Sequence, residues 1–427
     1  MLFIHIRIKR FWFHQNFSLI ERGDRMRDLL QLMQSYLGIY TERYCLENNL
    51  FISYDEKTQR PEYMTRKIIS LHEDIIDTDL NFIFGENQQI LVDNEHSDIL
   101  EEILYENDWN SLKDLIVFQG LVLGTTGVRV GRDSQGKIRI GFVNLLKHDI
   151  ERVLDDDGDT FGWYLRHKVD GKTIEEYFGK DKYWRRIDDV LVFETPNDYG
   201  IPWLFIIANK PSLNHDFLGI GEWEAYRQTV DEINSSLSRM AAIEDIYATP
   251  RFIVTGAASI QVKKEDRLWA LPNEAGEIKI LEYQGNILDS ILRKVEMLEN
   301  SLKQKAPELM LNDLGNISGY ALRLKMQKLE KKILKLRNTY FRKFEEMFGL
   351  VYQMATGFDY NEIYYTSDLV IPANEEELMK KLTTLRAMGL VSTKTVLTEL
   401  GYDFDEEQEL LKDEDMFINP NSPITGW

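Results

Sequence analysis

The sequence predicts an α+β fold, and three observations on the spacing of its apolar residues support this class. Helical spacing runs from Met26 to about Asn49 and again from about Glu62 to Phe84. The period changes to two between about residues 124 and 210, which predicts a β-rich unit joined to the N-terminal helices. Heptad-spaced seams then predict three long helices, at Gly221–Tyr247, Asn286–Lys305 and Ser318–Met347.

Shorter elements fill the first half of the chain. Two more helices are expected at Ser97–Tyr105 and Asp108–Leu123, and Asp133–Gly136 has the composition of a hairpin turn. Strands are expected at Gly127–Val130, Lys137–Val143, Glu151–Leu154, Gly162–Val169, Thr173–Phe178, Tyr183–Ile187, Val190–Glu194 and Trp203–Ala208.

The three long helices carry apolar residues spaced by three and four, which is typical of helices that pack against neighbouring helices. Pro250 and Pro307 end the first two of them. Short strands between these two are expected at Arg251–Thr255, Arg267–Leu271 and Glu277–Tyr283. After the third helix we expect a strand at Ile363–Ile371 and helices at Glu375–Met388 and Ser392–Leu400.

Charge and cysteine content exclude several classes of protein. The 427 residues carry a net charge of -20, whereas a protein that grips nucleic acid through phosphates is usually basic. An acidic protein can still handle DNA if its task is to let the DNA slide past. The single cysteine, Cys45, excludes a disulfide framework, and no apolar stretch reaches the roughly 18 residues that span a bilayer.

Signatures of catalysis and of metal binding are missing from the sequence. There is no Walker-type phosphate loop, and the glycines from Gly120 to Gly131 are expected at a helix-to-hairpin junction instead of a dinucleotide site. The acidic run Asp155–Asp159 lacks acidic residues at the first and last positions of a calcium loop, so we read it as a hairpin turn. The seven histidines have no metal-ligand spacing. We therefore predict no enzyme activity, no cofactor and no metal.

The first 25 residues differ from the remainder of the chain. Residues 1–25 are expected to be a non-native or disordered extension, or else a short added strand. Glu21–Arg25 can be encoded by a purine-rich stretch that resembles a bacterial ribosome-binding site, which makes Met26 the expected natural start.

Five segments, in this order, resemble the portal proteins of tailed bacteriophages, in particular of siphophages that infect Gram-positive hosts. They are Ile75–Gly85, Gly200–Glu222, Val230–Glu244, Asn316–Leu322 followed by a basic helix, and Gly389–Gly401. Each segment alone is a weak match, but their collinear order over about residues 62–410 makes the resemblance specific.

The resemblance implies a portal-type fold. Its parts are the extension 1–25, a wing of helices and β-rich unit at 26–215, stem helices at 216–247 and 286–308, a small α/β clip at 248–285, a tunnel loop at 309–317, a tunnel-lining helix with a returning wing strand at 318–371, and a short helical crown with the C-terminal tail at 372–427.

The resemblance also implies a function and partners. Such subunits form a homo-oligomeric ring of about twelve copies at one capsid vertex. Viral double-stranded DNA is packaged and ejected through the ring, which docks the terminase large subunit (the packaging ATPase) and later the head-completion or adaptor protein. Scaffold and major capsid protein are further partners, no membrane is involved, and the protein is expected in the virion and, during assembly, in the host cytoplasm. The alternative is a coiled-coil scaffold or adaptor protein without a DNA channel.

Candidate site residues follow from the same resemblance. The tunnel loop supplies Leu309, Asn312, Asp313, Gly315, Asn316 and Ser318; the phosphate-contacting candidates are Arg323, Lys325, Lys328, Lys331, Lys332 and Lys335; the clip contacts for motor or adaptor are Lys263, Lys264, Arg267 and Trp269.

The charge distribution leaves two interpretations of the third long helix. Ser318–Met347 contains nine basic and three acidic residues, whereas residues 372–418 contain five basic and twelve acidic residues. The basic face either contacts passing DNA phosphates or is an ordinary solvated face, which could meet acidic segments of a neighbouring subunit. Translocation requires sparse, sequence-blind contacts, since duplex DNA carries about one charge per 1.7 Å and a densely basic channel would hold it tightly.

Overall fold

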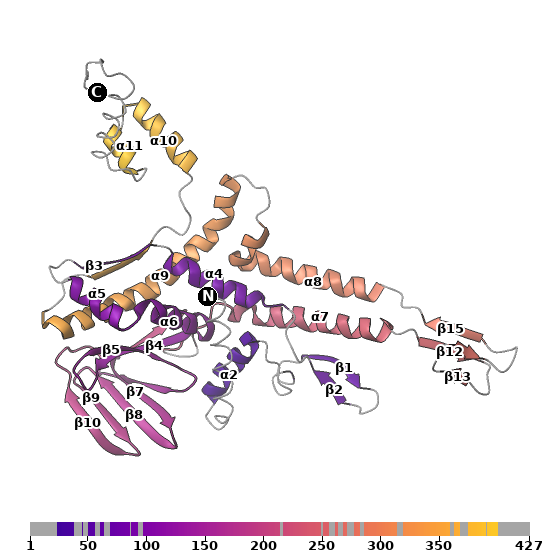
Figure 1. Ribbon diagram of the computed structural model, residues 1–427, viewed down its shortest axis with the longest axis horizontal. Helices are drawn as coiled ribbons and strands as arrows, with labels where there is room; N and C mark the ends of the chain where they lie inside the picture. The colour runs from indigo at the N-terminus through magenta and orange to yellow at the C-terminus, as the bar shows by residue number, and fades with distance from the viewer. Residues whose placement is uncertain are drawn as a thin grey trace. The chain divides into compact units, whose positions relative to one another are not determined.

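Helices and antiparallel sheets alternate along the chain in the computed structural model, which confirms the mixed helix-and-strand class predicted from the sequence (Figure 1). The chain divides into two units, Met1–Gly315 with Lys328–Asp368, and Asn316–Gln327 with Leu369–Trp427. The structure describes residues 24–37, 45, 50–55, 60–63, 69–85, 87–92, 97–213, 217–248, 251–255, 261–263, 268–270, 277–281, 286–313, 319–358, 363–367, 375–389 and 391–399.

The first two predicted helices differ from the prediction in different ways. Helix α2 spans Asp24–Leu37, and the rest of the helix predicted to about Asn49 lies, apart from Cys45, outside the described residues. Strands β1 (Phe51–Asp55) and β2 (Arg60–Tyr63) form an antiparallel hairpin that the sequence analysis missed. The helix expected from about Glu62 is therefore wrong at its start: α4 spans Leu71–Phe84. Pro61 lies in β2, and proline is disfavoured inside a helix.

Helix α6 (Trp109–Leu123) lies at the centre of the first unit. It contacts α2, α4, α5 (Ser97–Glu106) and the strands that follow it, and its side chains at Ile116, Val117 and Leu121 are fully buried. The helices predicted in this region are confirmed. Gly124 ends α6 in a left-handed conformation (φ 77°) that glycine adopts without strain.

Two antiparallel sheets form the β-rich unit, as the period-two pattern predicted. One has three strands in the order β11-β4-β5, and the other is a five-stranded meander in the order β10-β9-β8-β7-β6. The strands are β4 Thr125–Arg132, β5 Ile138–Val143, β6 Asp149–Leu154, β7 Thr160–Val169, β8 Lys172–Gly179, β9 Lys182–Ile187, β10 Val190–Pro196 and β11 Leu204–Ala208. The acidic run after β6 is a hairpin turn, in which the Asp155 carboxylate accepts a hydrogen bond from the Asp159 amide (2.8 Å).

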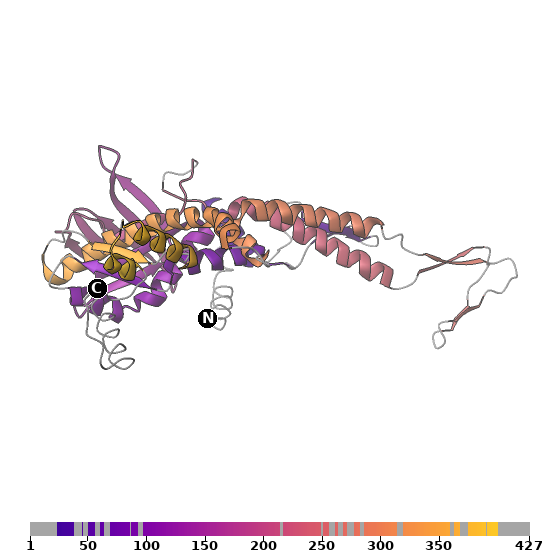
Figure 2. The same cartoon turned by 90° about the horizontal axis from the view of Figure 1, so that it is seen from above.

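Two long helices lie side by side within the first unit, as Figures 1 and 2 both show. They are α7 (Arg227–Ala248), preceded by the 3-10 turn η1 (Glu224–Tyr226), and α8 (Asn286–Lys305). Their predicted seams meet: Val230, Ile233, Val295 and Leu302 are buried in one cluster with Ile75 of α4. Packing within one subunit is thus confirmed for these seam residues.

Between α7 and α8 the chain forms two short ribbons. Strand β12 (Arg251–Thr255) pairs with β15 (Glu277–Leu281), and β13 (Gln261–Lys263) pairs with β14 (Leu268–Ala270). The strand at Gln261–Lys263 was not predicted.

The segment after α8 differs from its prediction. Pro307–Asp313 forms the 3-10 helix η2, and Leu309, which the resemblance assigns to the tunnel loop, is buried in the cluster of Ile75 and Val230. That assignment is corrected for Leu309, because its apolar side chain fills the space between α4, α7 and α8. Residues 314–318 of the predicted loop lie outside the described residues.

Helix α9 spans Gly319–Thr356 and is longer than predicted at its C-terminal end. Its second half carries the buried aromatic residues Tyr340, Phe344, Phe348 and Tyr352. Strand β16 (Ile363–Ser367), which was predicted, pairs with β3 (Gln88–Val92). The sequence analysis did not predict β3. Helices α10 (Glu375–Ala387) and α11 (Thr393–Glu399) of the second unit contact each other. No helix in the described part of the chain is long and apolar enough to cross a membrane.

A buried lysine–carboxylate junction as the candidate functional site

The glycine-containing segment before α7 runs closely against the end of α6. The amide of Glu222 donates to the carbonyl of Leu121 (2.8 Å), and the indole N–H of Trp223 donates to that of Val122 (3.1 Å). A Cβ atom on Gly221 would lie 2.6 Å from the Val122 carbonyl oxygen, and one on Gly219 would lie 2.2 Å from that of Gly124. A side chain at either position would force the two segments apart. The crossing explains why α7 starts later than predicted, and it places the Glu222 side chain in the protein interior.

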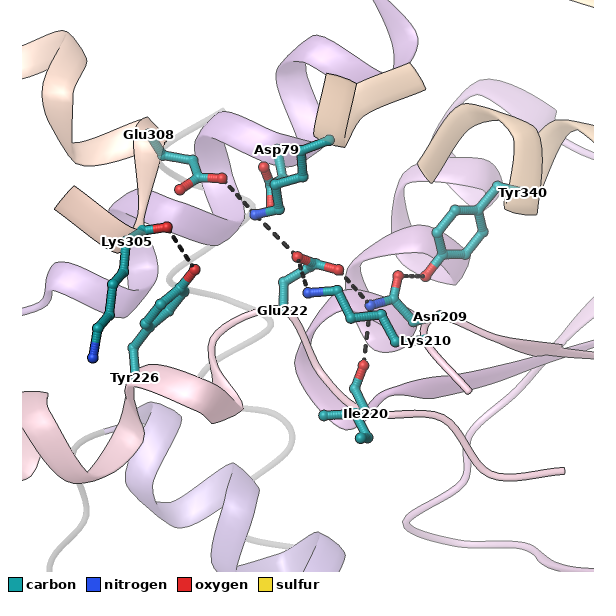
Figure 3. Close-up of polar contacts among 10 residues, drawn as sticks. Asp79, Asn209, Lys210, Ile220, Glu222, Tyr226, Lys305, Glu308 and Tyr340 are labelled. Atoms are coloured by element: carbon teal, nitrogen blue, oxygen red, sulfur yellow. Dashed lines mark hydrogen bonds and ion pairs between the residues drawn. The ribbon is translucent and has the colours of Figure 1, made fainter. Parts of the chain in front are cut away.

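Glu222 is one of three buried carboxylates that surround Lys332. Figure 3 labels Glu222 and the other two, Asp79 and Glu308. The Lys332 ammonium lies 2.6 Å from Asp79 Oδ2 and 3.0 Å from Glu222 Oε2, and it also pairs with Glu308 Oε1. The three carboxylate side chains are fully buried, and the Lys332 side chain is 15% exposed. Lys332 therefore connects α9 with α4, with the segment before α7, and with η2. We call Asp79, Glu222, Glu308 and Lys332 the junction.

A second layer of polar contacts supports Glu222 (Figure 3). Lys210 Nζ donates to Glu222 Oε2 (2.7 Å), and Asn209 Nδ2 donates to Glu222 Oε1 (2.8 Å). Asn209 Oδ1 in turn accepts a hydrogen bond from the hydroxyl of Tyr340 in α9 (3.1 Å), and the Tyr340 side chain is fully buried. In η1, just before α7, the Tyr226 hydroxyl donates to the Lys305 carbonyl (3.1 Å). This bond connects the start of α7 with the end of α8.

The electrostatics of the junction are unequal among its members. Burial raises the pKa of Asp79 well above its usual range, although Lys332 acts in the opposite direction. Burial also opposes the charge on Glu222, but Lys332 and Lys210 outweigh it and lower the pKa of Glu222. Burial would lower the pKa of Lys332, but the surrounding carboxylates outweigh it and raise that pKa. Of Asp79 and Glu222, Asp79 therefore takes up a proton more readily.

The other described basic residues of α9 lie in different surroundings, and Lys343, which is half-exposed, pairs with Glu346 (2.5 Å). Lys328, Lys331, Lys335 and Arg342 are exposed and follow each other at helical spacing along one face, which we call the basic stripe. At 1.5 Å per residue, the stripe extends over roughly 21 Å. Arg337, by contrast, is buried and donates to the carbonyls of Phe82 (2.9 Å) and Ile83 (2.8 Å) at the end of α4.

The structure thus separates the candidates that the sequence grouped together. The assignment of Lys332 as a phosphate-contacting residue is corrected, because its ammonium is enclosed by carboxylates of its own chain and does not lie on the exposed stripe. Lys328, Lys331 and Lys335 are brought together on one face, and Arg342 joins them. Arg323 and Lys325 lie in α9, but their side chains are outside the described residues.

Other candidates lie partly or wholly outside the described residues. Asn312 and Asp313 end η2, while Gly315, Asn316 and Ser318 are not described. Lys263 pairs with Leu268 and Trp269 with Val262 in the β13–β14 ribbon, while Lys264 and Arg267 are not described. Within the described ranges no group of three or more His, Cys, Asp or Glu residues is arranged to hold a metal ion; in the junction, Lys332 occupies the space between the carboxylates.

Sequence reasoning missed the junction. Asp79, Glu222 and Glu308 belong to three segments that are distant in sequence, and each looks like an ordinary surface acid. One signal was available for Lys332: it lies three residues after Leu329 and four before Leu336, both on the buried face of α9.

The fold is similar to that of a chain in a gene transfer agent particle. The chain is similar to a structure described as the virion of a native gene transfer agent particle, with a TM-score of 0.51 and 11% identity over 88% of this chain and 94% of that chain. Another match is a structure of the neck of the native particle computed with C12 symmetry, with a TM-score of 0.49 and 12% identity over 78% of this chain and 89% of that chain. At this identity the likeness to the virion structure shows a shared fold only.

The family is shown by a direct match. Residues 19–420 match the family described as "Phage portal protein, SPP1 Gp6-like", so the chain belongs to this family of phage portal proteins. It is accordingly a structural protein of the virion. No curated protein matches the chain.

Proposed function

We propose that the chain forms a ring of about twelve subunits at one capsid vertex, through which double-stranded DNA is packaged and ejected. Membership of the portal family supports a ring. The observation that carries the DNA role is the basic stripe, Lys328–Lys331–Lys335–Arg342, on a chain with a net charge of -20.

The orientation of α9 favours contact between this stripe and DNA. The opposite face of the helix is held by buried Leu329, Ile333 and Leu336, so the stripe cannot turn inward. Its four cations are exposed and lie on one helix, and Arg342 is also within 3.8 Å of Glu346. A sparse set of such cations attracts phosphates without reading sequence, and the net negative charge of the chain prevents tight retention.

The parts implied by the family can be assigned on the same basis. In our proposal α7 and α8 are the stem, the β12–β15 segment is the clip, and the sheets with the N-terminal helices are the wing. α9 lines the tunnel, and α10 and α11 belong to the crown. The clip would dock the terminase large subunit during packaging and the head-completion protein afterwards, while the outer parts of the ring would meet scaffold and capsid proteins.

Two experiments test the proposal. Negative-stain electron microscopy of the purified protein should show rings with a central hole, whereas dimers or fibres would favour a scaffold or adaptor role and monomers under all conditions would contradict the ring. The double variant Lys331→Ala/Lys335→Ala should package less DNA or retain it less well. Lys168→Ala/Lys172→Ala, which removes two exposed lysines at the β7–β8 turn, is the matched control. Equal packaging by both variants, with normal rings, would reject the phosphate contacts.

A further inference from the structure

The junction holds more negative charge than its lysines balance. Asp79, Glu222 and Glu308 together bring three carboxylates, while Lys332 lies among them and Lys210 reaches Glu222 from a half-exposed position. Lys332 has three N–H donors, and each faces a different carboxylate. One oxygen of Asp79 and one of Glu308 are consequently buried without a hydrogen-bond partner among the described residues. Such unsatisfied buried groups are costly and call for a physical reason.

The three carboxylates differ in how firmly they are held. Glu222 keeps hydrogen bonds from Lys210 and Asn209 in addition to Lys332. For Glu308, Lys332 is the one charged partner among the described residues, and Glu308 lies at the start of η2, a short 3-10 helix. If Glu308 moved into water, Asp79 and Glu222 would remain with Lys332 and Lys210, and the charges inside would balance.

We propose that Glu308 is a releasable latch, which holds η2 against α9 through Lys332 in a closed state and leaves the junction in an open state. Release restores charge balance in the interior and lets the Glu308 carboxylate regain water. Leu309 opposes release, because its buried side chain is packed against Ile75, Val230 and Leu302. The structure shows the closed state, in which the charge excess and the burial of Leu309 act in opposite directions.

The latch would regulate the position of η2 next to α9, the helix that carries the basic stripe. Any effect of this movement on DNA rests on the function proposed above, whereas the latch itself does not. Lys331 and Lys332 are adjacent on α9, so the same helix presents one ammonium to solvent and one to the latch. A force that DNA exerts on the stripe would thus act on the same helix that holds η2 through Lys332.

Asp79 determines how difficult closing is. In the closed state it faces Glu222, Glu308, Lys332 and the hydroxyl groups of Tyr226 and Tyr340, with Lys210 behind Glu222. Closing either leaves one excess negative charge inside or forces Asp79 to take up a proton. Asp79→Asn removes this cost in both cases, since the amide oxygen can still accept from Lys332.

The test is amide hydrogen exchange of the η2 peptide 307–313 in the purified full chain. Asp79→Asn should slow exchange there by about tenfold, which corresponds to about 1.4 kcal/mol in the opening equilibrium, because it removes the excess negative charge and keeps an acceptor for Lys332. Glu308→Gln should act in the same direction, so the test survives if one variant fails to fold. Leu309→Ala should speed exchange, and Asp289→Asn, an exposed acid on α8, should change nothing.

An ordinary salt bridge predicts the opposite sign. If Lys332 simply needed all three charges, Asp79→Asn and Glu308→Gln would loosen η2 and speed its exchange, and that result, or no change in either variant, overturns the latch. Protection of η2 in the unaltered protein, corrected for intrinsic exchange, should also fall as pH rises, and Asp79→Asn should abolish this dependence. These measurements need no ring and no DNA, so failure of the latch and failure of the proposed portal role are separate outcomes.

Discussion

Lys332→Met compared with Lys331→Met is the most direct test of the junction. The two lysines are neighbours on α9, and both variants remove one positive charge. Lys331 is exposed, whereas the Lys332 ammonium pairs with Asp79, Glu222 and Glu308. Removing one partner of a buried ion pair costs about 3–5 kcal/mol, because the charge left behind is uncompensated. An exposed substitution away from such features usually changes stability by less than about 0.5 kcal/mol.

The expected difference is large enough for thermal unfolding to detect. At about 2 °C per kcal/mol for a large domain, Lys332→Met should melt on the order of 5–10 °C lower than the unaltered protein. Lys331→Met should melt at nearly the same temperature as the unaltered protein. Tryptophan fluorescence can follow the transition, since Trp223, the residue after Glu222, is fully buried. All proteins should be measured at one concentration and in one oligomeric state. Equal melting temperatures of the two variants would refute the buried junction.

A compensating variant sharpens this result. Adding Asp79→Asn, Glu222→Gln and Glu308→Gln to Lys332→Met removes the charges that the lysine neutralised. Much of the lost stability should return, because replacing a whole buried ionic group is far less costly than breaking it. If the added substitutions lowered the melting temperature further, the loss in Lys332→Met would have another cause, such as packing.

Two further predictions follow from the fold. Gly221→Ala should lower the free energy of unfolding by about 1–3 kcal/mol, because its Cβ would lie 2.6 Å from the Val122 carbonyl oxygen. The control is Gly131→Ala, whose Cβ would meet nothing within 4 Å. Equal urea midpoints of the two variants would contradict the close crossing. Burial, with the nearby His167 and Arg129, lowers the pKa of His148 to about 4 from 6.5, so the unfolded chain binds the proton more readily. Stability should therefore fall as pH decreases from 6.5 toward 4, by up to about 3 kcal/mol, and His148→Gln should flatten this part of the curve of urea midpoint against pH.

Elements with a clear local pattern were predicted well. The predicted bounds of α8 are those of the structure, and α5, α6 and most strands between residues 124 and 210 are within a few residues of their predicted bounds. Alternating or helical spacing tells which face is apolar, and in α6 and β4, for example, the apolar residues are buried; β10 is the exception, because Val190, Leu191, Val192 and Phe193 are exposed. Strand β3 was missed because its residues alternate between half-buried and exposed positions, and it is stabilised by pairing with β16 far along the chain.

The candidate site was predicted only in part, and the basic residues of α9 show why. Their number and helical spacing are properties of the sequence, and these indicated a charged helix face. Whether a lysine is exposed or enclosed depends on the elements that pack on the helix. Leu329 and Leu336 turn one side of α9 inward, so Lys332 meets Asp79 and Glu308 while Lys331 meets solvent.

By itself the sequence determined the mixed fold class, the long helices with their apolar seams, and the resemblance to portal proteins, because each of these depends on residues that are close together in the chain or in collinear order. Only the tertiary structure decided that Glu222, carried inward by the glycine crossing, shares a lysine with Asp79 and Glu308. These residues come from segments with no local relation to one another. Their pairing is set by how α4, α6, α8 and α9 pack, and burial then gives their charges an energetic weight that surface acids and lysines do not have.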